Sequence, residues 1–372
     1  MRGPAVRPIV IAAGGTGGHF FPAEALAAAL LARGHRVALM TDARSGGLAS
    51  ATFAACETFV LRGAGLAGRG PLRAALAAAA LAAGTMQARA ALARLDAAAL
   101  VGFGGYPSVA PVLATRLLHR RPRVLLHEQN AVLGRANRAL SRFSDLLALS
   151  FANTEKLRTG VRTEVVGNPV RPAIVPAPYE APAETFRLLV LGGSLGARVF
   201  SDVVPHALAA LPETLRARLR VTQQCRPEDL NRVRAAYAAS GIPADLAPFF
   251  GDVAGLLRAA HLVIARAGAS TVAELGVVGR PAILVPLPGA IDDHQTANAR
   301  ALAQAGGAWV LPQGALSPAV LAENVRQLLS DPAALATAAA RAATQGRADA
   351  AARLADLVEA SILATTGRER AA

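Results

Sequence analysis

Residues 14–19, Gly-Gly-Thr-Gly-Gly-His, combine a glycine-rich loop with a titratable side chain. They follow an apolar run that predicts a strand, and a helical pattern with Pro22 near its first turn comes next. Glycines let backbone N–H groups surround a phosphate, and a helix N-terminus adds partial positive charge. Binding a phosphate needs no histidine, whereas moving a proton does. His19 is therefore a candidate general base.

Two other interpretations of this loop stay open. It can be an ordinary tight turn between a strand and a helix. A dinucleotide site is a weaker alternative, because the spacing is not Gly-x-Gly-x-x-Gly and only Asp42 follows the second strand.

Three more polar or glycine-rich segments follow predicted strands in the first half: 102–108, 127–130 and 167–171. Ligands of open α/β sheets bind beyond the carboxyl ends of the strands. The run His-Glu-Gln-Asn at 127–130 predicts a hydrogen-bonding site for a polyhydroxyl or amide ligand, although a single such residue would be a helix cap. Arg171 can reach a phosphate or be a solvated linker arginine. The glycines at 102–108 bring the backbone close to a ligand or to a neighbouring loop.

The second half repeats the pattern. Residues 192–198, Gly-Gly-Ser-Leu-Gly-Ala-Arg, are a candidate diphosphate site. In the segment 266–274, Ser270 and Thr271 can bind phosphate through their N–H groups, and Glu274 can accept ribose hydroxyls. Thr271-x-x-Glu274 also fits a capping box, which would use both side chains structurally. The polar segment 286–298 fits sugar recognition or a cap-rich helix start.

Composition narrows the class of protein. The chain has 372 residues, 53% of them hydrophobic, which predicts two domains. A net charge of +14 favours anionic partners, namely nucleotides or a membrane surface. Nucleic acid is disfavoured, because only 4% of residues are aromatic and no basic run is interleaved with them. Base composition of the genome is an alternative source of the arginine preference, with Lys156 the only lysine.

Cysteine usage and hydropathy bear on the compartment. Cys56 and Cys225 imply neither a disulfide framework nor a metal site, which fits a reducing cytosol. The N-terminus leads almost directly into a strand, so we expect no signal peptide. The uncharged stretch 74–88 is shorter than the ~20 residues of a spanning helix, so we expect no transmembrane segment.

Strand and helix patterns alternate along both halves, which predicts parallel sheets covered on both faces. Strands are predicted at 9–13, 36–40, 58–61, 98–101, 123–127, 146–149, 164–166, 187–191, 220–222, 246–250, 262–265, 282–286 and 308–311. Helices are predicted at 22–33, 72–95, 108–119 and 131–141, and in the tail from about 317. Prolines at 171–183 predict a linker between domains 1–170 and 184–344.

Taken in order, the motifs at 14–19, 104–106, 127–130, 167–171, 192–198 and 268–274 resemble the MurG family of bacterial N-acetylglucosaminyltransferases. The resemblance covers the chain nearly end to end. It implies a GT-B fold, in which two Rossmann-like α/β domains with parallel sheets face an interdomain cleft. It also implies that the last helix, about 345–372, packs back on the N-terminal domain.

The family implies transfer of GlcNAc from UDP-GlcNAc to the 4-hydroxyl of MurNAc in lipid I, giving lipid II in peptidoglycan synthesis. The implied donor contacts are Thr16, Gly17, Gly18, Asn130, Arg171, Ser194, Phe250, Ala269, Ser270, Thr271, Val272, Ala273, Glu274 and Gln295. The implied contacts to the acceptor diphosphate are Gly14, Gly15, Gly104, Gly105 and Tyr106. We expect His19 to be the base, with Glu128 as the reserve candidate or as its orienting partner.

Two segments depart from the family pattern. Leu195 stands where the family usually has glutamine, and the residues at 292–294 before Gln295 also differ. The chain contains no Asp-x-Asp, so we expect no metal and no cofactor. The expected partners are UDP-GlcNAc, a polyprenyl-diphosphate lipid and an anionic membrane surface, with the apolar and arginine-bearing stretch 66–83 as the membrane contact. The expected location is the cytoplasmic face of the cell membrane.

Three rival functions stay open. Another GT-B glycosyltransferase would use a different acceptor. A nucleotide-sugar epimerase would turn over UDP-GlcNAc without any acceptor, and a non-enzymatic anion-binding module would bind UDP but release none.

Overall fold

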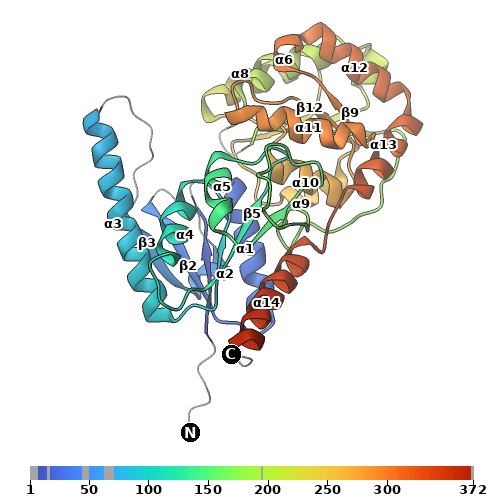
Figure 1. Ribbon diagram of the computed structural model, residues 1–372. Helices are drawn as coiled ribbons and strands as arrows, with labels where there is room; N and C mark the ends of the chain where they lie inside the picture. Colours follow the sequence, from blue (N-terminus) through green and yellow to red (C-terminus); the bar gives the residue numbers. More distant parts are fainter. Residues whose placement is uncertain (1–6, 15–16, 44–49, 63–70, 194–195, 370–372) are drawn as a thin grey trace. The chain divides into compact units, whose positions relative to one another are not determined.

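Figure 1 shows the computed structural model, which describes residues 7–14, 17–43, 50–62, 71–193 and 196–369. The chain divides into two compact units. The first unit comprises Met1–Arg171 and Asp349–Ala372, and the second comprises Pro172–Ala348. Cys56 in the first unit and Cys225 in the second are both free thiols.

A parallel sheet of seven strands lies at the centre of the first unit, in the order β3-β2-β1-β4-β5-β6-β7. Its strands are β1 (Ile9–Ala12), β2 (Val37–Asp42), β3 (Glu57–Leu61), β4 (Ala99–Gly102), β5 (Arg123–Glu128), β6 (Leu146–Leu149) and β7 (Thr163–Val165). The order reverses between β1 and β4, so the loops after these two strands diverge and leave room for a ligand.

Helices cover both faces of this sheet, because alternate residues of each strand point to opposite sides. The helices are α1 (Gly17–Ala32), α2 (Ala51–Ala54), α3 (Pro71–Leu95), α4 (Val109–Thr115), α5 (Arg135–Leu140) and α14 (Ala350–Glu369). Ile9 and Ile11 pack in one core with α1, α2 and α14. Val10 and Ala12 pack in the other core with α3, α4 and α5.

The second unit has the same topology with six parallel strands, in the order β10-β9-β8-β11-β12-β13. Its strands are β8 (Phe186–Leu191), β9 (Leu219–Gln224), β10 (Ala244–Ala247), β11 (Leu262–Ala265), β12 (Ala282–Leu284) and β13 (Ala308–Val310). Its helices are α6 (Arg198–Ala209), α7 (Glu213–Arg216), α8 (Leu230–Ala239), α9 (Val253–Ala259), α10 (Ala269–Val278), α11 (His294–Gln304), α12 (Pro318–Ser330) and α13 (Pro332–Thr344). Here the order reverses between β8 and β11.

The predicted parallel α/β class is confirmed, and every predicted strand is present within a few residues of its expected bounds. Helix bounds were less accurate. Helix α1 begins at Gly17 rather than at residue 22, so His19 lies in its first turn and Pro22 lies inside the helix. Proline has no N–H, so the carbonyl of Gly18 loses its usual helical donor there.

Two further helix bounds were wrong. Helix α5 begins at Arg135 rather than at residue 131, because Val132 forms a parallel bridge with Glu155 and is held extended. The N–H of Leu133 donates to the carbonyl of Glu155 at 3.0 Å. Helix α4 ends at Thr115 rather than at residue 119.

Helix α3 agrees within one residue with the predicted helix 72–95, and it extends beyond the uncharged stretch 74–88. By length and composition alone, its segment Ala74–Leu95 is apolar enough to cross a membrane. The helix nevertheless packs against α4 and β3, and Ala88 and Leu92 on that side are buried in the core. A helix that covers a sheet meets the same test of length and composition, so this finding does not establish a membrane span.

Candidate active site

His19 lies where the loops after β1 and β4 diverge. Its Nδ1 atom is 2.8 Å from the carbonyl oxygen of Phe103 and 3.0 Å from Oε1 of Gln129. Both partners are hydrogen-bond acceptors, so Nδ1 carries the proton and Nε2 keeps a lone pair. The ring is half-buried, and a Cβ atom at Gly105 would lie 3.5 Å from Nε2. The sequence placed His19 in a turn, and the structure places it over the neighbouring glycine loop.

The four polar residues at 127–130 do not form one open hydrogen-bonding surface. His127, Glu128 and Gln129 are buried, whereas Asn130 is half-buried. Their bonds go to other parts of the first unit. The prediction of a ligand site made by all four side chains is therefore wrong for the three buried ones, whose polar groups bond to the protein.

The carboxylate of Glu128 accepts four hydrogen bonds. The donors are the N–H and Nδ2 of Asn130, at 3.0 and 3.1 Å, the N–H of Gly134 at 3.0 Å, and Nδ2 of Asn137 at 2.9 Å. These donors follow β5 and lead into α5, so the carboxylate holds the β5–α5 loop in place. Such a carboxylate orients its surroundings, and its lone pairs are used by these four donors.

The glycine loop after β4 adopts backbone conformations that favour glycine. Gly104 has φ 76° and Gly105 has φ 65°. Ser108 donates to the carbonyls of Ala12 at 3.1 Å and Gly104 at 2.9 Å, which joins this loop to the end of β1. Tyr106 begins a short 3₁₀ turn. Gly14 has φ 154°, and Gly15 and Thr16 lie outside the described residues.

Asn168 and Arg171 follow β7. Asn168 is 4% exposed, and neither its Oδ1 nor its Nδ2 atom has a partner among the described residues. A buried amide without a partner is costly, which makes Asn168 a candidate ligand contact. The guanidinium of Arg171 lies over the Phe21 ring, 5.5 Å from its centroid, so the sequence-predicted arginine is stacked on α1.

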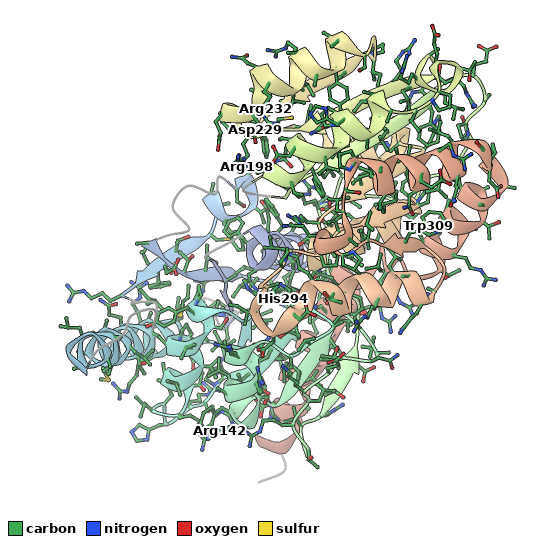
Figure 2. All side chains as sticks on the ribbon, turned by 90° about the horizontal axis from the view of Figure 1, so that it is seen from above. Arg142, Arg198, Asp229, Arg232, His294 and Trp309 are labelled. Carbon is green, nitrogen blue, oxygen red and sulfur yellow. The ribbon has the colours of Figure 1, made fainter. Side chains whose placement is uncertain are left out.

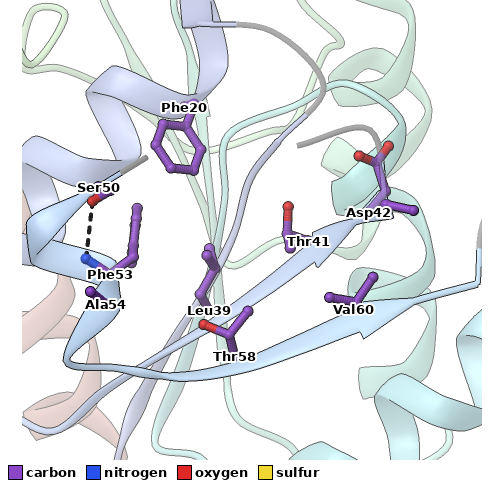
Figure 3. Close-up of a pocket in the computed structure, with 10 residues that line it drawn as sticks. Phe20, Leu39, Thr41, Asp42, Ser50, Phe53, Ala54, Thr58 and Val60 are labelled. Carbon is purple, nitrogen blue, oxygen red and sulfur yellow. Dashed lines mark hydrogen bonds between the residues drawn. The ribbon is translucent and has the colours of Figure 1, made fainter. Parts of the chain in front are cut away.

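A cavity of about 440 Å³ lies beside this site, at the carboxyl ends of β2 and β3 (Figure 3). Phe20, Leu39, Phe53 and Val60 give it apolar walls. The hydroxyl of Thr41 points into the space and has no partner among the described residues. Asp42, Ser50 and Thr58 add polar groups to the lining of the cavity.

In the second unit, Gln224 fixes the glycine loop after β8. Its Oε1 accepts from the N–H of Gly192 at 3.1 Å, and its Nε2 donates to the carbonyls of Gly193 and Pro248, each at 3.1 Å. A Cβ atom at Gly192 would lie 2.4 Å from the backbone nitrogen of Ala197, so only glycine fits there. Ser194 and Leu195 lie outside the described residues.

The bond to Pro248 also positions the segment that follows β10. The side chain of Phe249 is 76% exposed, and that of Phe250 is half-buried. The loop after β8 and this aromatic segment are thus held at the same edge of the sheet.

Helix α10 begins after β11, as predicted. Its N-cap is Gly268, and no side chain caps it. Thr271 and Glu274 are the third and sixth residues of the helix, so the capping-box alternative is wrong. Ser270 and Thr271 lie in the first turn, where N–H groups and the helix dipole favour an anion. The buried hydroxyl of Ser270 has no partner among the described residues, whereas Glu274 is buried and has one.

Gln295 lies in the first turn of α11. Its Oε1 accepts from the N–H groups of Ala267 at 3.2 Å and Leu287 at 3.0 Å. The side-chain carbonyl is therefore used structurally, and only the Nε2 donors can serve a sugar. Asn298, fully buried on the same helix, donates to the carbonyl of Ala267 at 3.1 Å.

Arg266, at the end of β11, holds the next strand end. It is 9% exposed, and burial lowers the pKa of its guanidinium. It donates to the carbonyls of Val285 and Pro286 at 3.1 and 3.2 Å, and to Oε1 of Gln313 at 2.7 Å. It thereby fixes the segment that leads to Gln295.

An ion-pair cluster lies beside the second glycine loop, and Figure 2 labels Arg198, Asp229 and Arg232 within it. Arg226 and Arg232 both bond to Asp229, at 2.8 and 2.9 Å. The hydrogen bond from Arg226 lowers the pKa of Asp229. The side-chain carbons of Arg226 also pack over Gly196, where a Cβ atom would lie 2.7 Å away.

Sequence interpretation missed three residues that hold these loops, namely Gln224, Arg266 and Asn137. For Arg266, it missed the bonds to the segment after β12. Asn137 donates to the carbonyl of His127 and to Glu128. Gln224 had a usable signal, because it ends β9 at the edge where the other loops lie. Asn137 had none, since it is an ordinary polar residue inside a helix.

Two family models match the chain in sequence order. The glycosyltransferase family 28 N-terminal domain matches residues 9–148, and the glycosyltransferase family 28 C-terminal domain matches residues 187–354. The chain belongs to glycosyltransferase family 28.

Full-length relatives locate the chain within glycosyltransferase family 28. A protein of Granulibacter bethesdensis is 62% identical over 97% of this chain and 95% of its own length. A protein of Acidiphilium cryptum is 58% identical over 97% of this chain and 99% of its own length. Both carry the name UDP-N-acetylglucosamine–N-acetylmuramyl-(pentapeptide) pyrophosphoryl-undecaprenol N-acetylglucosamine transferase.

Solved structures agree with this placement. The crystal structure of Acinetobacter baumannii MurG superimposes with a TM-score of 0.79 at 30% identity, covering 95% of this chain and 99% of that one. The calicheamicin glycosyltransferase CalG4 has a TM-score of 0.66 at 17% identity, covering 96% of this chain and 99% of that one, which supports the fold alone. The MurG resemblance and the GT-B class, with two parallel-sheet α/β domains, are confirmed.

Proposed function

We propose that this enzyme transfers GlcNAc from UDP-GlcNAc to the 4-hydroxyl of MurNAc in lipid I, with inversion at the anomeric carbon, giving lipid II and UDP. One observation carries the proposal: 62% identity over 97% of the chain to a transferase named for this reaction. The fold alone would not suffice. A UDP-N-acetylglucosamine 2-epimerase of Listeria monocytogenes shares it with a TM-score of 0.63 at 14% identity.

His19 fits the role of general base. Its Nδ1–H is held by acceptors, so Nε2 can take the proton of the acceptor hydroxyl. As the hydroxyl oxygen bonds to C1 of GlcNAc, the bond from C1 to the diphosphate oxygen breaks, and its electron pair leaves with UDP. Glu128, with four donors around its carboxylate, takes the orienting role.

The donor diphosphate requires positive potential as charge develops on the leaving group. The loop at Gly192 and Gly193 and the first turn of α10, from Ala269 to Thr271, supply N–H groups and a helix dipole. The unpartnered hydroxyl of Ser270 adds a donor. Further proposed donor contacts are Ser194, Phe250, Val272, Ala273, Glu274 and Gln295, and from the first unit Thr16, Gly17, Gly18, Asn130 and Arg171.

The acceptor diphosphate is assigned to the first unit. Gly104 and Gly105, with left-handed backbone conformations, let N–H groups approach an anion closely beside His19. Gly14, Gly15 and Tyr106 are the remaining proposed contacts. This placement puts the acceptor hydroxyl within reach of the base, because MurNAc is attached to that diphosphate.

We further propose that the enzyme binds the cytoplasmic face of the cell membrane through the first half of α3. Residues 74–83 carry no charge, and most of them are exposed, with Leu76 62% exposed. A lipid-linked acceptor requires contact with a bilayer, and an exposed apolar helix face beside cationic side chains binds anionic interfaces. The arginine-bearing stretch 66–70, predicted to assist, lies outside the described residues.

A UDP-release assay tests the function. With UDP-GlcNAc and a short-chain lipid I analogue we expect UDP and a disaccharide-lipid product in equal amounts. UDP-GlcNAc alone should release little UDP. Acceptor-independent turnover would favour the epimerase, and binding of UDP without any release would favour a binding module.

A substitution tests the base. His19→Ala should lower kcat by about 10²-fold or more, since general base catalysis contributes roughly that much. His35→Ala is the matched control, because His35 bonds to Glu359 at 2.7 Å and not to the site. Near-normal turnover of His19→Ala would show that another group accepts the proton.

A further inference from the structure

His127 and Gln129 are buried polar side chains with no assigned role. Their exposed fractions are 0% and 1%, so neither can touch a substrate in this conformation. Both lie on the same side of the chain, because they are two residues apart at the end of a strand. Together they connect the Gly167 loop to His19.

The proton positions along this connection follow from the acceptors. Nε2 of His127 is 3.0 Å from the carbonyl oxygen of Gly167, which can only accept, so Nε2 carries the proton. Nδ1 of His127 is then an acceptor. Burial lowers the pKa of His127 to about 4, so the ring is neutral and this arrangement persists at neutral pH.

Gln129 can face this site in only one way. Its Nε2 atom lies near three acceptors: the carbonyl of Phe103 at 3.0 Å, Nδ1 of His127 at 3.1 Å, and the carbonyl of His127 at 3.2 Å. Turning the amide over would place its oxygen against two carbonyl oxygens. The amide oxygen therefore faces Nδ1 of His19, at 3.0 Å.

We propose that Gln129, held in one orientation by His127, is a positioning residue that fixes the tautomer and ring orientation of His19 so that Nε2 accepts the proton of the substrate. The carbonyl of Phe103 accepts from the same Nδ1–H at 2.8 Å and from Gln129 at 3.0 Å. Three loops thus meet at one imidazole, those after β1, β4 and β5. The inference rests on the proposed role of His19 as the base.

The neutral amide differs from the carboxylate that often orients a catalytic histidine. Gln129 offers an acceptor to His19 and donors to its other neighbours, and an ionised carboxylate would meet two carbonyl oxygens in this place. The carboxylate of Glu128 next to it is bonded to Asn130, Gly134 and Asn137 instead.

The test is Gln129→Met, which keeps the length of the side chain and removes its polar atoms. We expect kcat to fall about tenfold, because the ring samples unproductive orientations, while KM for UDP-GlcNAc stays within twofold. Gln223→Met is the matched control. Gln223 is also fully buried, but it lies on β9 of the second unit and bonds to Tyr237.

A double-mutant cycle separates a role through His19 from a structural role. In the His19→Ala enzyme, Gln129→Met should change kcat by less than twofold. An equal loss in both backgrounds would overturn the proposal. His127→Phe should also lower kcat, but by less than Gln129→Met does, because Gln129 keeps its bonds to the carbonyls of Phe103 and residue 127.

Nitrogen-15 spectra of histidine-labelled enzyme give a readout that does not depend on turnover. The chain has 7 histidines, and the signal missing from His19→Ala identifies the ring of interest. We expect the Nδ1–H tautomer in the wild type and a mixture in Gln129→Met. An unchanged tautomer in Gln129→Met would contradict the proposal. Normal turnover of His19→Ala would reject the assignment of His19 as the base. The spectra would still test whether Gln129 fixes the tautomer of His19.

Discussion

Several buried polar side chains of this enzyme bond to backbone carbonyls from segments far apart in sequence. Arg280 is 2% exposed, and its guanidinium nitrogens lie between 2.8 and 3.2 Å from six carbonyl oxygens, which share its five N–H donors. They belong to residues 177–178 of the connection after β7, to the end of α9, and to the turn after α10. Removing this side chain would take a hydrogen-bond donor from each of these carbonyls, so one residue joins three segments.

Arg280→Ala should therefore destabilise the second unit by about 3 kcal/mol or more, because it removes the hydrogen bonds that a buried guanidinium donates to three segments. Arg280→Lys should recover only part of this, since an ammonium has three donors and lacks the planar fork of arginine. Chemical denaturation measures both variants.

Arg234→Lys is the control for this comparison. Arg234 is exposed, and within the described part of the chain its side chain donates only to Asn231 of its own helix, at 3.3 Å. We expect its change in the free energy of unfolding to be within about 0.5 kcal/mol. Equal stability of Arg280→Ala and Arg234→Lys would contradict the proposed role of Arg280 in joining three segments.

Sequence patterns predicted the loops of the candidate site but not the bonds within them. The glycine loops and His19 were predicted because each follows a strand, where parallel sheets bind ligands. The role of 127–130 was misjudged, because polar residues at a strand end suggest a ligand until their partners are known. The two-residue spacing of His127 and Gln129 was a missed signal that both face the same side. Their partners Phe103 and Gly167 come from distant segments, which local patterns do not specify.

At the scale of elements, the strands were predictable because short apolar runs rich in Val, Ile and Leu alternate with glycine and proline signals. Helix ends were less predictable. The start of α1 depends on how the loop before His19 packs, and Pro22 inside the helix contradicts the usual first-turn preference. The start of α5 depends on the bridge of Val132 to Glu155, which is tertiary.

Helix α3 carries a prediction at this scale. Leu76→Glu should lower binding to vesicles that contain phosphatidylglycerol by about tenfold, because burying a leucine contributes roughly 1.5 kcal/mol or more. Turnover of a water-soluble acceptor analogue should not change. Vesicle sedimentation measures the binding.

Leu363→Glu provides the matched control for the membrane face. Leu363 is 69% exposed and lies on α14, which covers the opposite face of the same sheet. We expect it to leave vesicle binding unchanged. Equal losses for the two variants would argue against α3 as the membrane contact, and so would wild-type binding that ignores anionic lipid.

At the scale of the whole molecule, the first unit is assembled from both ends of the chain. Helix α14 packs beside α1 (Figure 1), and its Leu354, Ala355 and Val358 complete the core around Ile9 and Ile11. Composition and periodicity predicted a helical tail, but only the family resemblance predicted where it packs. Local sequence does not encode a contact across more than 300 residues, because the partner surface forms only when the sheet does.

An electrostatic contact at this junction makes the stability of the first unit depend on pH. The carboxylate of Glu359 on α14 accepts hydrogen bonds from His35 and Arg33, each at 2.7 Å. The bond from His35, together with the positive charge of Arg33, lowers the pKa of Glu359 from its ordinary value. A carboxyl group whose pKa is lower in the folded state stabilises the fold above its unfolded pKa. The contribution is lost as the pH falls through the folded value.

Glu359→Gln should therefore lower Tm by about 2 °C at pH 7, in keeping with a partly exposed ion pair worth about 1 kcal/mol or less. The difference from wild type should shrink below about pH 4.5, where the wild-type carboxylate begins to take up a proton. Glu184→Gln is the control, because Glu184 is exposed and its carboxylate makes no hydrogen bond or ion pair with the residues that the structure describes. Calorimetry at the two pH values measures the effect. If the difference in Tm between Glu359→Gln and wild type stays constant or grows in acid, the carboxylate does not hold α14 on α1. The substitution would then have the same effect whether or not the wild-type carboxyl group is protonated.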